Sequence, residues 1–383
     1  MLTNSDLIEL TELRRELHKR PEVSGHEEGT ARRIASALRQ LSPDRVLTGL
    51  GGHGVAAVFK GAAEGPAVLF RAELDALPIH ELSDAPWVSQ HPGKGHLCGH
   101  DGHMTTLLAL GRLIARRPVA SGRVILMFQP AEEDGSGARA VTTDPAFLEI
   151  APDWAFAIHN LPGRKLGQFG VWPGLMNCAS QGLEITLTGK TAHAANPEDG
   201  ISPAAALSRL IPALEALGHG GALDDTFRLA TITHIRMGEP TFGISPGEAS
   251  LYVTLRTAND AAMNALVAQA RHLASAAAEE AGLGARFAVH DAFAASVNDP
   301  EAARIARAAM EAVGADVDTQ GQPMRASEDF GMFGWTAKAA MLLLGAGEAH
   351  AALHNPDYDF PDDLIPIGAT VFERIARDIL GTA

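Results

Sequence analysis

The hydrophobic pattern of the amino-terminal part of the chain alternates between helical and strand-like segments. Apolar positions recur with a helical period near 5–19, 27–41 and 101–116. Between them lie short, nearly continuous apolar runs, which are typical of strands buried on both faces of a sheet. These runs are VAAVF, AVLFRAEL, RVILMFQ and WAFAIH. The pattern therefore predicts an α/β domain whose mixed sheet is covered by helices on both faces.

A different pattern occupies the middle of the chain. Apolar and polar residues alternate in GLEITLTG, FRLATITHI and ASLYVTLRT, as in strands with one face exposed to water. Two helical segments separate these strands, and ARFAVHDAF looks like a closing strand. The chain then returns to a helix, a buried strand containing AAMLLLGA, and a last helix after DDLIPIG. We therefore expect a catalytic domain of residues 1–177 and 294–383, interrupted by a smaller inserted α+β domain of residues 178–293.

Composition and charge narrow the classes of function. The chain has 383 residues and 46% hydrophobic content, enough for two cores. Its formal net charge of -15 would repel nucleic acids and anionic lipid surfaces. The longest apolar stretch, AAMLLLGAG, is far shorter than the roughly 20 residues of a membrane helix. The amino terminus lacks a signal-peptide core, and the only cysteines, Cys98 and Cys178, suit a reducing compartment, so we expect a cytoplasmic protein without nucleic-acid or membrane partners.

The stretch CGHDGH, residues 98–103, places a thiol and an imidazole two positions apart on a glycine-broken turn. Cys98 and His100 can therefore converge on one point, and thiolate and imidazole are good ligands for zinc, manganese and similar divalent ions. A buried thiol beside a helix-capping aspartate is the alternative interpretation of this stretch taken alone.

Two adjacent carboxylates, Glu132 and Glu133, follow the predicted strand RVILMFQ. Functional side chains commonly lie at the ends of strands in open α/β sheets. Because neighbouring side chains point in different directions, one carboxylate can bind a metal while the other accepts a proton from water. For this pair alone, a solvated acidic loop is the alternative.

Two histidines complete the pattern. His159 ends the run WAFAIH, and His354 follows the last predicted buried strand. A lone histidine at such a place is more often a hydrogen-bonded structural residue than a ligand. If the four strand ends converge, however, five side chains could hold two ions that share bridging atoms: Cys98, His100, Glu133, His159 and His354.

Eight segments spread along nearly the whole chain carry a resemblance in both order and spacing. They are LHKRPEVSGHEEGT, RAELDALPI, GHLCGHDGH, FQPAEE, AIHNLPG, GKTAHAANP, SEDFGMF and LHNPDYDFPDD. With these motifs the sequence strongly resembles the metal-dependent amidohydrolases and metallopeptidases related to aminoacylase and bacterial glutamate carboxypeptidase. Within that family it is most similar to the branch of hippurate hydrolases and auxin–amino acid hydrolases.

The resemblance implies a catalytic domain with two divalent ions and an inserted lid that usually forms a homodimer. It makes the five side chains above the metal ligands and Glu132 the general base. It also implies that His193 reaches the substrate carbonyl, while Asp75 and His103 orient the ligands. Arg256 is a candidate for binding a substrate carboxylate, since a guanidinium pairs with it bidentately.

The expected reaction is hydrolysis of the amide bond between an acyl or aroyl group and an amino acid, a small-molecule substrate. Zinc, manganese, cobalt and nickel all suit the ligand set. The alternatives are a dipeptidase, a carboxypeptidase or a hydrolase of an unusual amide on the same site, and, more remotely, a non-catalytic metal-containing binding protein. Three departures from the family pattern bear on substrate preference: Glu73 in place of an aspartate, Gly243 in place of an asparagine, and Lys190-Thr191 in place of Gly-Gly.

Overall fold

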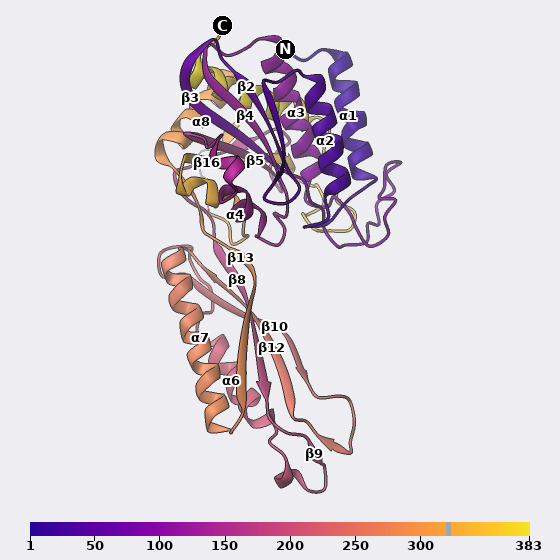
Figure 1. Ribbon diagram of the computed structural model, residues 1–383, viewed down its shortest axis with the longest axis vertical. Coiled ribbons are helices and arrows are strands. Elements are labelled where there is room, and N and C mark those ends of the chain that lie inside the picture. Colours follow the sequence, from indigo (N-terminus) through magenta and orange to yellow (C-terminus); the bar gives the residue numbers. More distant parts are fainter. Residues whose placement is uncertain (319–322) are drawn as a thin grey trace. The chain divides into compact units, whose positions relative to one another are not determined.

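The computed structural model describes residues 1–318 and 323–383. The chain forms two compact units, each with its own sheet (Figure 1). Unit 1 consists of Met1–Met176, Ser296–Gln322 and Asp329–Ala383. Unit 2 consists of Asn177–Ala295 and Pro323–Glu328. The second piece of unit 2 is a late return of the chain that the hydrophobic pattern did not predict.

Unit 1 is built on a mixed sheet of eight strands in the order β1-β2-β4-β3-β5-β16-β6-β15. The central strands β4, β3, β5 and β16 run parallel, whereas β1 and β2 are antiparallel to their neighbours. The carboxyl ends of the four central strands therefore meet at one edge. The strands are β1 (Arg45–Leu50), β2 (Gly54–Lys60), β3 (Ala63–Glu73), β4 (Ser121–Gln129), β5 (Trp154–Pro162), β6 (Phe169–Gly170), β15 (Val317–Asp318) and β16 (Lys338–Gly347).

Helices cover both faces of this sheet, as the apolar runs predicted. Long helices form the main core on one face, where the ring of Phe70 lies 4.8 Å from that of Phe372 and 5.9 Å from that of Phe156. Burying one such aromatic side chain contributes about 1.5–3 kcal/mol. These helices are α1 (Asn4–His18), α2 (Glu28–Gln40), α3 (His100–Arg116), α8 (Pro300–Ala312) and α9 (Leu364–Leu380). Shorter helices pack elsewhere on the sheet: α4 (Gly137–Thr142), α5 (Pro145–Leu148) and η2 (Asp329–Trp335).

Local capping chemistry sets the helix boundaries. At the start of α1, the Thr3 hydroxyl accepts a hydrogen bond from the Asp6 N–H, and the Asp6 carboxylate accepts one from the Thr3 N–H, which is a capping box. The prediction that the last helix begins after DDLIPIG was wrong, because α9 begins at Leu364. Pro366 lies in its first turn, where an N–H would have no partner within the helix, so the proline is tolerated.

Unit 2 contains an antiparallel sheet in the order β10-β12-β8-β13 with α6 and α7 on one face (Figure 1). Along β12, Leu251, Val253 and Leu255 are buried, whereas Tyr252 between them is 39% exposed. This confirms the predicted strands with one wet face. The elements are β8 (Ala179–Thr188), α6 (Ala204–Glu215), β10 (Arg228–Met237), β12 (Glu248–Thr257), α7 (Asp260–Glu280) and β13 (Gly284–Phe293), with the short β9 (Ala192–His193), η1 (Pro197–Asp199) and β11 (Ile244–Ser245). Two further short strands, β7 (Gly174–Asn177) and β14 (Ser296–Asn298), pair separately.

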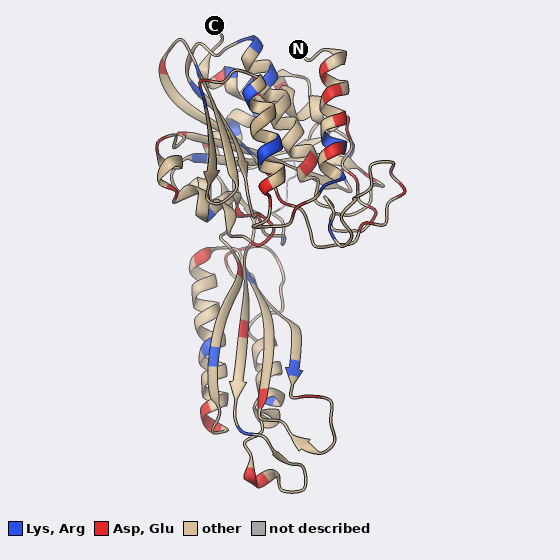
Figure 2. Ribbon diagram, turned by 45° about the vertical axis from the view of Figure 1, so that its right-hand side comes forward, with Lys and Arg blue, Asp and Glu red and all other residues tan. Residues whose placement is uncertain are grey.

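Charged residues of both signs lie together on the helices of unit 1 (Figure 2). In the sequence of α1, for example, Glu12 and Glu16 flank Arg14 and Arg15. Acidic and basic side chains therefore alternate along this helix. Among the described residues, no helix combines the length and the apolar character needed to span a bilayer.

Candidate metal centre and catalytic site

The candidate site lies in unit 1, at the edge where the central parallel strands end. Glu73 is the last residue of β3, and the pair Glu132–Glu133 follows β4. His159 lies on β5, and His354 follows β16. The helix α3 begins at the same edge with His100 as its first residue.

The structure brings all five predicted ligands together. The Sγ atom of Cys98 lies 3.5 Å from Nε2 of His159, and Nε2 of His100 lies 3.8 Å from Oε1 of Glu133. Nε2 of His354 lies 3.7 Å from Oε2 of Glu133. The donor atoms form two compact sets, each within 4.8 Å, and both sets contain Cys98. Two divalent ions could be held by these sets, which have Cys98 in common; the sets are Cys98, His100 and His159, and Cys98, Glu133 and His354.

Hydrogen bonds fix the histidine tautomers. Nδ1 of His100 donates to the Asp75 carbonyl at 2.9 Å, and Nδ1 of His159 donates to the Asn160 carbonyl at 2.7 Å. Since a carbonyl only accepts, each neutral imidazole keeps its lone pair on Nε2. Nε2 of His100 is buried and has no hydrogen-bond partner among the residues that the structure describes. Burying a polar atom without a partner lowers the stability of the folded protein by about 1–3 kcal/mol. A divalent cation bound by Nε2 would remove this penalty, so the donor set fits such an ion well.

The two imidazoles differ in their affinity for protons. Burial lowers the pKa of His159 to about 3, with the neighbouring His103 acting in the same direction. Burial also opposes the charge on His100, but nearby carboxylates, with Glu73 first among them, outweigh it and raise its pKa to about 10. A cation that binds His100 must therefore displace a proton from it.

Gly99 explains the spacing of Cys98 and His100. It caps the amino end of α3 with φ 92°, a left-handed conformation that glycine adopts without strain. A Cβ atom there would lie 2.0 Å from Oδ1 of the buried Asn160. The glycine therefore lets the two ligands face one point while the backbone turns into the helix.

The two carboxylates lie on a tightly held turn. Ala131 has φ 49°, and its carbonyl accepts a hydrogen bond from the Gly137 N–H at 2.9 Å. Glu132 is only 5% exposed, and its Oε2 lies 3.9 Å from Nε2 of His100. Glu132 is thus next to the donor set and can act as a base there, while Glu133 contacts both His100 and His354.

Asp75 forms hydrogen bonds with two of the candidate ligands, His100 and Glu133. Its backbone carbonyl accepts from His100, and Oδ2 of its carboxylate accepts from the Glu133 N–H at 2.9 Å and the Ser24 hydroxyl at 2.8 Å. Burial opposes its charge, yet hydrogen bonds, chiefly from His100, lower the pKa of Asp75 below its ordinary value. Asp75 is therefore placed to orient the imidazole of His100 and the backbone that carries Glu133.

His103 supports the site through Glu73. Its Nδ1 donates to Oε2 of Glu73 at 2.7 Å, and its Nε2 accepts from the Asn160 N–H at 3.3 Å. Both ring nitrogens are thus engaged by protein groups, which suits an orienting residue. Glu73 also pairs with Arg71, whose Nη2 lies 2.8 Å from Oδ1 of Asp329. Sequence reasoning missed Arg71 and Asp329, although both lie in the quoted motifs RAELDALPI and SEDFGMF.

The other two predicted site residues lie in unit 2. His193, on β9, is exposed, and its Nδ1 accepts from the Ala195 N–H at 3.0 Å. Arg256, on β12, donates from Nη1 to the Arg325 carbonyl and the Ser327 hydroxyl. Within residues 1–318 and 323–383, no carboxylate forms an ion pair with Arg256.

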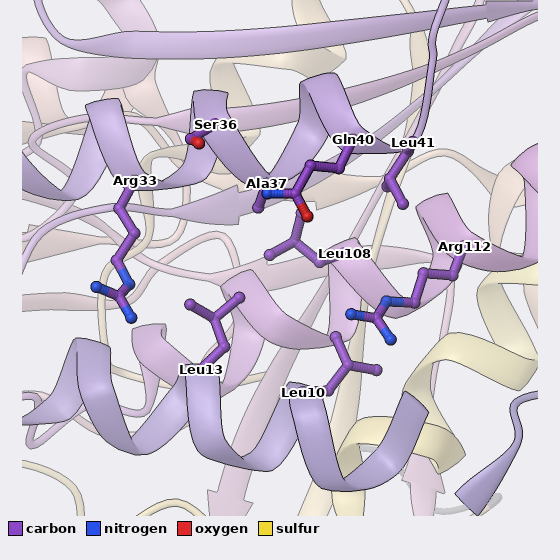
Figure 3. Close-up of a pocket in the computed structure, with 9 residues that line it drawn as sticks. All are labelled: Leu10, Leu13, Arg33, Ser36, Ala37, Gln40, Leu41, Leu108 and Arg112. Carbon is purple, nitrogen blue, oxygen red and sulfur yellow. The ribbon is translucent and has the colours of Figure 1, made fainter. Parts of the chain in front are cut away.

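A hollow of about 330 Å³ lies between α1, α2 and α3 (Figure 3). Leu10, Leu13 and Leu108 line it, with Arg33 and Arg112 at opposite ends. None of its lining residues is a cysteine, histidine, aspartate or glutamate, so it offers no set of metal ligands.

Known proteins share this chain's sequence and fold. Hippurate hydrolase of Campylobacter jejuni is 29% identical over 374 residues, covering 97% of both chains. N-acetylcysteine deacetylase of Bacillus subtilis is 28% identical over 374 residues, again 97% of both. A Bacillus subtilis structure described as YXEP, a dinuclear metal binding peptidase from the M20 family, covers 100% of both chains with a TM-score of 0.82 and 26% identity.

These matches confirm the family resemblance, the α/β fold class and a metal-dependent hydrolase as the class of enzyme. The dinuclear centre of the structural relative agrees with the two ions that the donor atoms here can hold. The model of one family, described as Peptidase family M20/M25/M40, matches residues 69–378. The chain belongs to this family.

Proposed function

We propose that the protein hydrolyses the amide bond of N-acyl or N-aroyl amino acids. The observation that carries the proposal is the gathering of five metal-ligating side chains beside the buried carboxylate of Glu132. The names of two relatives, hippurate hydrolase and N-acetylcysteine deacetylase, denote substrates of this class and support it.

The chain's own groups account for the proton transfers. Divalent ions held by the five ligands would lower the pKa of a water molecule and polarise a carbonyl group. Glu132 would take the proton of the attacking water and pass it to the departing amine nitrogen. Because Nδ1 of His193 accepts a backbone hydrogen bond, Nε2 carries the proton in the neutral ring and can donate to the carbonyl oxygen.

We infer that Arg256 binds the carboxylate of the substrate's amino acid part. Its guanidinium is partly buried and has no ion-pair partner among the described residues, and a buried cation favours an anionic ligand. Replacing Arg256 by methionine should raise KM for an N-acyl amino acid but leave KM for the matching N-acyl amino acid amide unchanged. An equal rise for both compounds would contradict this role.

Several finer points also belong to the proposal. Zinc, manganese, cobalt or nickel would suit the thiolate, imidazole and carboxylate donors. The family resemblance further suggests a homodimer formed through unit 2 and a cytoplasmic enzyme whose partner is a small-molecule amide.

The test is hydrolysis by protein that has been chelated and then reloaded with each ion in turn. The panel contains N-acetyl, N-benzoyl and indole-acetyl amino acids together with dipeptides. We expect ion-dependent release of free amino acid from the N-acyl compounds. Preference for dipeptides would favour the dipeptidase alternative, and ion binding without hydrolysis of any compound would favour a non-catalytic binding protein.

A further inference from the structure

Two carboxylates from distant parts of unit 1 accept backbone hydrogen bonds from the turn that carries Glu132 and Glu133. Asp75 accepts the hydrogen bond of the Glu133 N–H at 2.9 Å. Glu27, at the amino end of α2, accepts that of the Ala131 N–H at 2.9 Å. Together they fix the backbone on both sides of Glu132.

Glu27 is an unusual group to bury. The residue is 0% exposed, and no cationic side chain of the described residues forms an ion pair with it. Oε1 accepts from the N–H groups of Gly25 and Ala131, whereas Oε2 is buried without a hydrogen-bond partner in the part of the chain that the structure describes. Burying an ionised carboxylate without a cationic partner lowers the stability of the folded protein. A contribution to stability therefore does not explain why Glu27 is buried here.

The carboxylate of Glu27 binds a residue with an unusual backbone conformation, Ala131. Its φ of 49° lies in the left-handed region, which alanine rarely adopts. Its N–H is bound by Glu27 and its carbonyl by the Gly137 N–H, so both of its backbone groups are fixed. Such conformations persist only where the surroundings enforce them, and they cluster at functional sites.

We infer that Glu27 is a positioning residue that keeps Ala131 in this conformation and thereby aims the carboxylate of Glu132. The inference rests on the proposed function of Glu132 as the base. Loss of Glu27 should affect turnover more than metal binding, because Asp75 still holds the Glu133 N–H.

The test compares Glu27→Ala and Glu27→Asp with Glu22→Ala. Glu22 is a matched control, since its carboxylate accepts from the Thr30 N–H at 2.7 Å and so supports the same end of α2 without touching the turn. We expect both Glu27 variants to lower kcat by about 10- to 100-fold, with KM and the number of zinc ions bound unchanged. Glu22→Ala should lower the unfolding temperature but leave kcat unchanged. Equal kcat losses in the Glu22 and Glu27 variants would overturn the inference.

Two further measurements separate positioning from loss of fold and from failure of the proposed function. Hydrogen exchange of the peptide spanning 128–135 should accelerate in the Glu27 variants but not in Glu22→Ala, whether or not any substrate is hydrolysed. Ala131→Gly removes the penalty of the left-handed backbone, so it should restore part of the kcat lost in Glu27→Asp. Unchanged exchange, or purely additive effects of the two substitutions, would contradict the role of Glu27.

Discussion

Cys98 and His159 lie 61 positions apart in the chain, yet Sγ of the first is 3.5 Å from Nε2 of the second. The thiol comes from the turn before α3, and the imidazole comes from β5. Cys98 also belongs to the second donor set, with Glu133 and His354. Its sulfur is therefore the donor atom that the two candidate sets of ligands have in common.

Replacing Cys98 by serine should weaken zinc binding at both positions, since a hydroxyl is a much poorer zinc ligand than a thiolate. The affinity should fall by more than about 100-fold, beyond the 10- to 100-fold typical of groups that only orient a ligand. Titration with a zinc chelator measures it. Cys178→Ser is the control, because this cysteine lies in unit 2, and the prediction fails if both variants bind zinc equally.

Replacing Glu132 by glutamine should preserve zinc binding while lowering kcat by about 10²–10⁴-fold, the usual contribution of a general base. Glu133→Gln is the companion variant and should lose zinc, because Glu133 lies against both His100 and His354. Steady-state kinetics and metal analysis of both variants test whether Glu132 serves as the base and Glu133 as a metal ligand. Full turnover by Glu132→Gln would exclude Glu132 as the base.

Replacing Gly99 by alanine should destabilise the protein and weaken zinc binding. The added methyl group requires a strained backbone and meets Asn160. Gly163→Ala provides the comparison, since Gly163 has φ 83° but open space around its Cβ position. Urea unfolding should show a loss of about 1 kcal/mol for Gly163→Ala and a larger loss for Gly99→Ala. Equal losses would mean that the close approach of Asn160 is unimportant.

His18 should make stability depend on alkaline pH. Its Nδ1 lies 2.8 Å from Asp101 and its Nε2 lies 3.1 Å from Glu81, so both nitrogens face carboxylates. Burial opposes the charge, but Asp101 and Glu81 outweigh it and raise the pKa of His18 to about 10. A raised pKa means that the stabilisation is complete below the unfolded value of about 6.5 and disappears as the pH rises through about 10.

The difference in unfolding free energy between the wild-type protein and His18→Gln should therefore shrink from pH 6.5 to pH 10. Urea titrations at these two pH values measure it. A constant difference would show that His18 is not charged in the folded protein.

Local patterns in the sequence determined the elements and the ligand types. The helical period near 101–116 predicted α3, and apolar runs predicted the central strands of unit 1. These predictions succeed because helix and strand periodicities, and the affinity of a thiol or an imidazole for a cation, are properties of short stretches. Since functional side chains commonly lie at the ends of strands in open α/β sheets, the sequence allowed Glu133 and His159 to meet Cys98, but it did not fix the strand order that brings them together.

Only the tertiary structure showed the contacts that Glu27, Arg71 and Asp329 make around the site. The contact of Glu27 with Ala131 joins positions 104 apart, and that of Arg71 with Asp329 joins positions 258 apart. A buried carboxylate is stable only where donors converge on it, and such convergence depends on the packing of whole elements rather than on neighbours in the chain. For the same reason, the sequence did not predict that Pro323–Glu328 returns to unit 2. Neither the periodicity nor the composition of that segment indicates which unit it packs against.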